Sequence, residues 1–183
     1  MYEVEVKAKL RNRESILKKL KDLGCSFSEN LHQIDEIFIE KDAVFPTKLG
    51  TPVLRVRAEN DRYLFTLKMQ QTNRQDCIER EMEIEDGPKM VEIIKMLGWK
   101  QVPTVDKNRI KTKLGDIEVV LDEVKDLGEY IEAEKVLTSN DQEERIKVQN
   151  ELYDFLEELG IPREDFIIDG KYDIMLFDKF GMK

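Results

Sequence analysis

Apolar and polar residues alternate along much of this chain, starting with Glu-Val-Glu-Val-Lys at residues 3–7. Successive side chains of a β-strand point to opposite faces, so this alternation predicts a strand with one charged face and one apolar face. The pattern predicts eight such strands, at residues 2–10, 33–40, 53–58, 62–69, 77–85, 105–113, 116–124 and 129–136. Short turns, such as residues 59–61 and 114–116, join several of them. We therefore expect mostly antiparallel neighbours.

Helical periodicity replaces the alternation in three longer segments, residues 12–23, 88–97 and 140–159. Asn12 fits the N-cap of the first helix, and Ser139 with Gln142 resembles a capping box at the start of the third. A glycine follows each helix, which suits the left-handed residue that commonly ends one. The remaining expectations are a loop at 41–52 and short helices or turns near 163–167 and 173–180.

The polar faces of the predicted strands carry charges that are largely of one sign. The basic faces contain Arg55, Arg57, Lys68, Lys107, Arg109, Lys111 and Lys113, and the acidic faces contain Glu79, Glu81, Glu83, Glu85, Glu118, Asp122, Glu132 and Glu134. Like charges two residues apart on a strand lie roughly 7 Å apart and repel each other. Such faces either lie in water on an open sheet or hold ions of the opposite sign. Paired arginines suit phosphate oxygens, and carboxylates suit Mg²⁺.

Eight antiparallel strands can close into a barrel. If the charged faces point inward, the apolar faces point outward, and the amphipathic helices can cover them. The sequence therefore predicts an α+β fold in a single domain over residues 1–183. This fold is a closed antiparallel eight-stranded barrel, a tunnel with a hydrophilic interior and helices packed on its outside. An open sheet with one solvated face is the alternative.

Composition narrows the function further. Charged residues make up 38% of the chain, and the net charge of −9 argues against general nucleic-acid binding. Cys25 and Cys77 lack metal-like spacing and are expected to be buried free thiols, and a single histidine, His32, excludes His-rich zinc sites. We expect His32 to be structural or exposed. No run approaches transmembrane length, so we expect no membrane insertion and a cytoplasmic location.

Taken in order, the charged motifs resemble those of the CYTH family, the triphosphate tunnel metalloenzymes. This family is named for class IV adenylyl cyclase and thiamine triphosphatase. The motifs that carry the resemblance are Glu3-x-Glu5-x-Lys7, Leu54-Arg55-Val56-Arg57, Thr66-Leu67-Lys68, Glu81-Met82-Glu83, Lys107-x-Arg109, Asp122, Glu132-x-Glu134 and Lys171-Tyr172. They span nearly the whole chain, and their shared order is more specific than any one of them.

The resemblance implies a tunnel that binds a small-molecule triphosphate, ATP or tripolyphosphate, together with Mg²⁺ or Mn²⁺. The residues implied as phosphate ligands are Lys7, Arg55, Arg57, Lys68, Lys107 and Arg109. The residues implied as metal ligands are Glu3, Glu5, Glu81, Glu83, Asp122, Glu132 and Glu134. Glu5, Lys7 and Glu83 are the expected catalytic residues. Lys111 and Glu79 are second-rank candidates, from the alternation alone.

The resemblance leaves three functions open. The first is a metal-dependent enzyme most like a class IV adenylyl cyclase, which converts ATP to cyclic AMP and pyrophosphate. The second is a triphosphatase that hydrolyses inorganic triphosphate, thiamine triphosphate or a nucleoside triphosphate. The third is a non-catalytic module that binds nucleotides or polyphosphate. The family resemblance also implies that a homodimer is possible.

Overall fold

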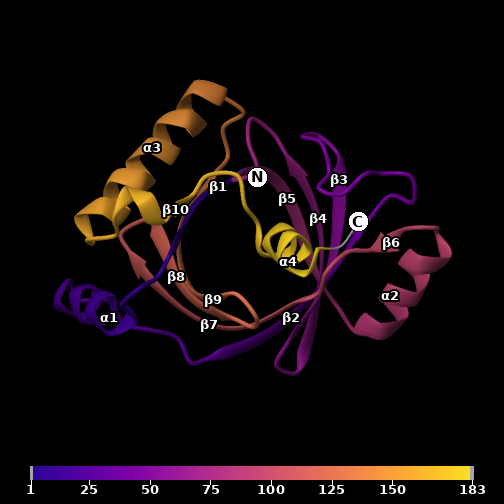
Figure 1. Ribbon diagram of the computed structural model, residues 1–183, viewed down its shortest axis with the longest axis horizontal. Coiled ribbons are helices and arrows are strands. Elements are labelled where there is room, and N and C mark those ends of the chain that lie inside the picture. Colours follow the sequence, from indigo (N-terminus) through magenta and orange to yellow (C-terminus); the bar gives the residue numbers. More distant parts are fainter. Residues whose placement is uncertain (1, 182–183) are drawn as a thin grey trace.

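Eight strands pair edge to edge and close into an antiparallel barrel (Figure 1) in the computed structural model, which describes residues 2–181. The barrel strands are β1 (Tyr2–Lys9), β2 (Leu31–Ile39), β3 (Pro52–Glu59), β4 (Arg62–Gln70), β5 (Asp76–Ile84), β7 (Val105–Leu114), β8 (Ile117–Val124) and β9 (Gly128–Leu137). They follow the order β1-β5-β4-β3-β2-β7-β8-β9, and β9 pairs back with β1 to close the ring. The predicted closed eight-stranded barrel is confirmed. The predicted domain limits, residues 1 and 183, lie outside the described residues.

Two short strands extend this barrel. β6 (Lys100–Gln101) pairs with β2, and β10 (Phe166–Ile167) pairs with β1. The turn expected near 163–167 is a 3₁₀ helix at Arg163–Asp165 that leads into β10. Neither strand was predicted, because two residues are too few to show an alternation.

The helices begin and end close to the predicted residues. They are α1 (Arg13–Asp22), α2 (Gly87–Met96), α3 (Gln142–Glu158) and α4 (Tyr172–Phe180). The Asn12 side chain accepts a hydrogen bond from the Ser15 backbone N–H at 3.0 Å, as expected of an N-cap. In α3 the cap is Asp141 rather than Ser139, because the Asp141 carboxylate accepts from the Glu143 N–H. Gly24 and Gly98 end α1 and α2 with positive φ angles of 86° and 87°, which glycine adopts without strain.

Apolar side chains on the outer face of the barrel pack beneath the helices. Val6 of β1 and Ile131 of β9 lie fully buried in one cluster with Leu20 of α1 and Leu152 of α3. A separate cluster packs Ile94 of α2 on the outside of β2 and β3. Burying each such side chain stabilises the fold by about 1.5–3 kcal/mol. This packing fixes the apolar faces outward, and the charged faces of the same strands therefore point inward.

All four helices lie outside the strand wall, and α4 lies across one end of the barrel, in front of the ring of strands in Figure 1. Tyr172 and Leu176 of α4 join a third apolar cluster with Ile39, Val105 and Tyr130 from the barrel. This cluster covers that end of the interior and places residues from the end of the chain beside the inward face of the first strand.

Candidate active site

A cavity of about 330 Å³ occupies the barrel interior. It is lined by most of the charged residues that the sequence analysis selected: Glu3, Glu5, Lys7, Arg55, Arg57, Lys68, Glu79, Glu81, Lys107, Arg109, Lys111, Glu132 and Glu134. These residues come from β1, β3, β4, β5, β7 and β9. The structure therefore brings together side chains from residues 3 to 134 on the surface of one cavity.

Two of the selected carboxylates do not line the cavity. Glu83 is exposed and pairs in register with Leu64 of β4, beyond the cavity along the same strand face. Asp122 is fully buried, but its carboxylate accepts two hydrogen bonds from the Arg109 guanidinium, at 2.7 and 2.5 Å. Asp122 thus holds an arginine in place, and the assignment of Glu83 and Asp122 as metal ligands stays a prediction.

Three carboxylates converge on one wall of the cavity. Oxygen atoms of Glu3, Glu5 and Glu134 all lie within 4.8 Å of one another. Burial, together with the charge of Glu3, raises the pKa of Glu134 to about 8. Burial also raises the pKa of Glu3. The raised pKa values indicate that the nearby cations, Lys68 for Glu3 and Arg109 for Glu134, do not offset burial, and a divalent cation would add positive charge.

Glu5 differs from its two neighbours because two ammonium groups lie close to one of its carboxylate oxygens. Lys171 donates a hydrogen bond to the Glu5 carboxylate at 3.0 Å, and the Lys7 ammonium lies 3.7 Å from the same oxygen. Although burial raises the pKa of Glu5, these two charges lower it to about 2. Glu5 is therefore ionised at neutral pH and is the most strongly anionic member of the cluster.

Basic side chains of β1 and β7 share Glu132 of β9. The Lys7 ammonium lies 2.9 Å from one Glu132 oxygen, and an Arg109 N–H donates to the other at 2.7 Å. Both cations are less than a tenth exposed. Each is held in one geometry before any ligand binds, as a preorganised anion site requires.

A second group of bases surrounds Asp35. The Arg57 guanidinium donates two hydrogen bonds to the Asp35 carboxylate, at 2.6 and 2.9 Å, and Lys107 donates a third at 3.3 Å. Burial and the nearby Arg109 charge lower the pKa of Lys107 to about 8. Asp35 was not among the predicted site residues, although its position between Gln33 and Ile37 in the alternation placed it on the inward face.

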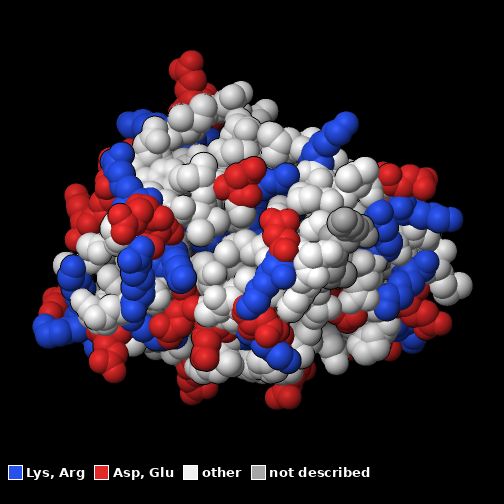
Figure 2. All heavy atoms as spheres, viewed as in Figure 1, with Lys and Arg blue, Asp and Glu red and all other residues white. Residues whose placement is uncertain are grey.

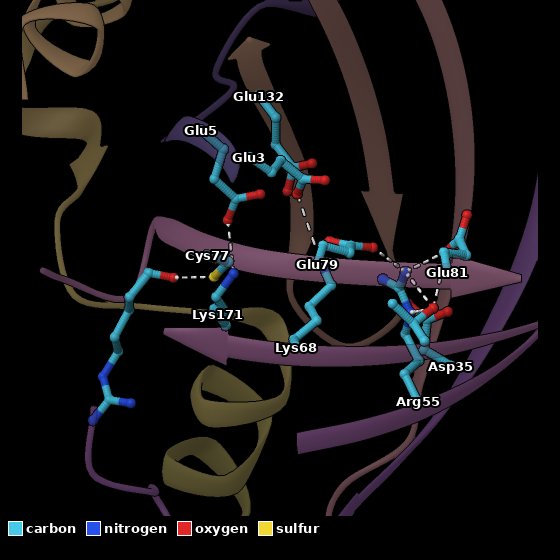
Figure 3. Close-up of polar contacts among 12 residues, drawn as sticks. Glu3, Glu5, Asp35, Arg55, Lys68, Cys77, Glu79, Glu81, Glu132 and Lys171 are labelled. Atoms are coloured by element: carbon cyan, nitrogen blue, oxygen red, sulfur yellow. Dashed lines mark hydrogen bonds and ion pairs between the residues drawn. The ribbon is translucent and has the colours of Figure 1, made fainter. Parts of the chain in front are cut away.

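Figure 3 shows a third group, on β3, β4 and β5. Arg55 donates to Glu79 at 3.2 Å and to Glu81 at 3.0 Å. The Lys68 ammonium lies 2.5 Å from Glu79 and 3.4 Å from Glu3. Glu79, a second-rank candidate, is thus the carboxylate that holds the two neighbouring cations. Lys111, the other second-rank candidate, pairs with Glu118 at 2.9 Å.

The segment before α4 completes the site. Lys171 points to Glu5 beside the buried thiol of Cys77 (Figure 3), and the Lys7 ammonium sits 4.2 Å from the centre of the Tyr172 ring. The Lys171-Tyr172 motif was noticed in the sequence as part of the family resemblance. It could have pointed to Lys171 as a site residue, but no role was predicted for this lysine. His32, expected to be structural or exposed, is half-exposed and contacts Asp106 at 2.8 Å, away from the cavity.

Outside the cavity, acidic and basic side chains intermix over the face that carries α4 (Figure 2). Cys25 and Cys77 are both buried free thiols, as expected. Within residues 2–181, the helices are too short or too polar to cross a membrane.

Comparison with known proteins identifies the family. The family model of the CYTH domain matches residues 1–170. A Methanocaldococcus jannaschii protein named "Putative adenylate cyclase MJ0240" is 34% identical over 169 residues, which cover 91% of this chain and 94% of that protein. The structure of the PH1819 protein from Pyrococcus horikoshii OT3 has a TM-score of 0.80 at 27% identity, covering 97% of this chain and 99% of that one.

A Hippeastrum protein described as a "putative adenylyl cyclase" with "a dominant" triphosphatase activity has a TM-score of 0.55 at 18% identity, covering 98% of this chain and 96% of that one, and shows the shared fold alone. The family model spans most of the chain, and the Methanocaldococcus relative matches over nearly its full length. This protein belongs to the CYTH family.

Proposed function

We propose that this protein is a metal-dependent enzyme that acts on a triphosphate inside the barrel. The observation that carries the proposal is the composition of one cavity. Seven buried or partly buried bases from four strands surround the same space as the carboxylate cluster of Glu3, Glu5 and Glu134. Phosphoryl transfer needs positioning and charge stabilisation more than covalent chemistry, and this lining supplies both.

The bases are now neutralised by carboxylates, and a triphosphate would replace those partners. Arg55 and Lys68 both contact Glu79, and Arg57 and Lys107 both contact Asp35. Non-bridging phosphate oxygens accept hydrogen bonds in the same fork geometry as a carboxylate. Because these cations face one cavity from different strands, they would hold a chain of phosphate groups from several sides and exclude water from it.

The carboxylate cluster would hold Mg²⁺ or Mn²⁺. Its three glutamates offer hard oxygen ligands, which both ions prefer. A bound divalent ion would offset phosphate charge and polarise a phosphoryl oxygen. Glu5 supplies a negative charge, while Lys171 and Lys7, which contact it, line the cavity that would hold the phosphate groups. Glu81, at the edge of the cavity, and Glu132, held by Lys7 and Arg109, are further carboxylates within the same lining.

Adenylyl cyclase is the first candidate reaction, because the Methanocaldococcus relative carries that name. In that reaction the ribose 3′-oxygen of ATP attacks the α-phosphorus and pyrophosphate leaves. A triphosphatase, in which water attacks the terminal phosphorus, is the second candidate. A triphosphatase would use the same phosphate-binding bases and the same carboxylate cluster in the cavity lining. Because Cys25 and Cys77 are free thiols, we place the reaction in the reducing cytoplasm.

Product analysis tests the proposal. The protein is incubated with ATP or tripolyphosphate and with Mg²⁺, Mn²⁺ or EDTA. Cyclic AMP with pyrophosphate identifies a cyclase, and release of orthophosphate identifies a triphosphatase; EDTA is expected to stop either reaction. Tight binding of both compounds without turnover would leave the non-catalytic module and contradict the proposed enzyme.

A further inference from the structure

We propose that Gln75 is a positioning residue for Glu5 and Lys171. This inference rests on the proposed function, because it concerns how a carboxylate that would hold the metal and its ammonium partner are kept in place. Gln75 lies in the turn before β5, is 0% exposed and is not among the residues that line the cavity. It therefore acts on the site only through the residues that it holds.

The backbone of Glu5 lies at a gap in the strand pairing. One edge of β1 pairs with β9 along its whole length, while the other edge pairs with β5 at residues 2–4 and with β10 at residues 7–8. Between these two stretches, the Glu5 N–H donates to the Gln75 backbone carbonyl at 2.9 Å. The Gln149 side chain of α3 donates to the Glu5 carbonyl at 3.4 Å. Buried backbone groups need such partners, so Gln75 and Gln149 take the place of a strand at Glu5.

The side chain of Gln75 holds the segment that leads to Lys171. Its amide nitrogen donates to the backbone carbonyl of Ile167 in β10, and Ile167 lies opposite Lys7 in the pairing of β10 with β1. Lys171 follows four residues later and donates to the Glu5 carboxylate at 3.0 Å. The backbone of Gln75 thus holds one member of this ion pair, and its side chain holds the segment before the other.

Two side chains of α3 orient the Gln75 amide. The Tyr153 hydroxyl donates to the Gln75 side-chain oxygen at 2.8 Å, and Gln149 donates to the same oxygen at 3.5 Å. The Tyr153 ring also stacks on Phe166 of β10, with ring centres 5.1 Å apart. A buried polar network whose hydrogen bonds are all made is rigid, because each broken bond would leave a polar atom without water. These contacts therefore fix the Gln75 amide from outside the barrel.

The position of Glu5 matters for metal binding because three carboxylates must meet at one point. Oxygen atoms of Glu3, Glu5 and Glu134 lie within 4.8 Å of one another, and a shift of β1 at Glu5 would separate them. Groups that orient metal ligands without touching the metal typically change metal affinity or activity by about 10–100-fold when they are removed. The alternative is that Gln75 only joins α3 to the barrel, in which case its loss would lower stability and leave metal binding unchanged.

A matched pair of substitutions separates the two explanations. Gln33 is also 0% exposed, does not line the cavity, and donates a hydrogen bond to Glu59 rather than to a group beside Glu5. Q75M and Q33M each replace a buried amide with an apolar side chain of similar size, so both should lower the free energy of unfolding in urea. We expect Q75M to weaken Mn²⁺ binding in the presence of tripolyphosphate by about 10-fold or more. Q33M should change it by less than about 2-fold.

Isothermal titration calorimetry measures the Mn²⁺ affinity of each protein. Y153F provides a second test if Q75M does not fold: it removes one hydrogen bond from Gln75, and a loss of about 3-fold is expected, within the range for one hydrogen bond. Unchanged affinity in Q75M, or in Y153F where Q75M does not fold, would overturn the positioning role while leaving the proposed function intact. An equal loss in Q33M would also overturn it. If the unmodified protein binds neither Mn²⁺ nor tripolyphosphate, the proposed function itself fails.

Discussion

Replacing Asp35 with asparagine should strongly destabilise the protein. The Asp35 side chain is 5% exposed and is the shared partner of two buried cations, Arg57 and Lys107. The D35N substitution keeps nearly the same side-chain shape but removes the negative charge. The new amide oxygen could still accept one hydrogen bond from Arg57, while the amide nitrogen would face guanidinium and ammonium donors.

The expected loss follows from the burial of this group. Removing one partner of a buried ion pair costs about 3–5 kcal/mol, because the remaining charge stays buried without compensation. Since one hydrogen bond to Arg57 can survive, we expect the lower part of this range, about 3 kcal/mol. Single domains are stable by only about 5–15 kcal/mol, so this would be a large fraction of the total.

Urea unfolding followed by circular dichroism measures the change. With an m value of about 2–3 kcal/mol/M, a loss of about 3 kcal/mol moves the midpoint by roughly 1–1.5 M. D106N is the matched control: Asp106 is one-third exposed and pairs with His32 and Lys125 at the surface, so a change below about 1 kcal/mol is expected. Saturating tripolyphosphate should restore part of the stability of D35N by replacing the lost anion. A loss below about 1 kcal/mol in D35N would refute the role of Asp35.

Three further outcomes follow from the site. R57A should weaken triphosphate binding by about 1.5–3 kcal/mol, the size of a charge-assisted hydrogen bond, and calorimetry that finds unchanged affinity would show that this arginine does not contact the ligand. Folding lowers the pKa of Lys107 from 10.5 to about 8. Between these two pH values the Lys107 side chain is protonated in the unfolded chain and largely neutral in the folded protein. The free energy of unfolding therefore rises with pH over this range. This pH-dependent rise in the free energy of unfolding amounts to about 2 kcal/mol between pH 7 and pH 9.5, and K107M should remove it. Urea unfolding of K107M and of the unmodified protein over this pH range measures the effect. Parallel pH profiles of the two proteins would contradict the prediction. E5Q should retain the far-ultraviolet dichroism of the native barrel, since Val4 and Val6 on the opposite face stay packed, yet lose metal-dependent turnover; full activity would remove Glu5 from the site.

The alternation of residue types was sufficient to predict the barrel and the inward direction of most charged side chains. A period of two fixes which face a residue occupies once the other face is buried under helices. It does not fix how far along the barrel axis a residue lies. For that reason Glu83 was selected with Glu81, although the strand carries it beyond the cavity and into solvent.

Long-range contacts were the other part that the pattern could not supply. Lys171 reaches Glu5 across 166 positions of sequence, and only the docking of α4 over the barrel end brings them together. Asp122 and Asp35 show a related limit: both are inward carboxylates beside bases, but one is enclosed with its arginine and the other faces the cavity. Which of the two arrangements occurs depends on side-chain packing, which charge alternation does not encode.

The most direct test of the central claim is a Mn²⁺ titration in the presence of tripolyphosphate, for the unmodified protein and for E134Q. Glu123, exposed on β8 and outside the cavity, provides the matched control variant E123Q. If Glu3, Glu5 and Glu134 hold the metal, calorimetry should detect Mn²⁺ binding to the unmodified protein and to E123Q, with a loss of at least about 10-fold in affinity for E134Q. Equal Mn²⁺ affinity in all three proteins would contradict a metal site at this carboxylate cluster.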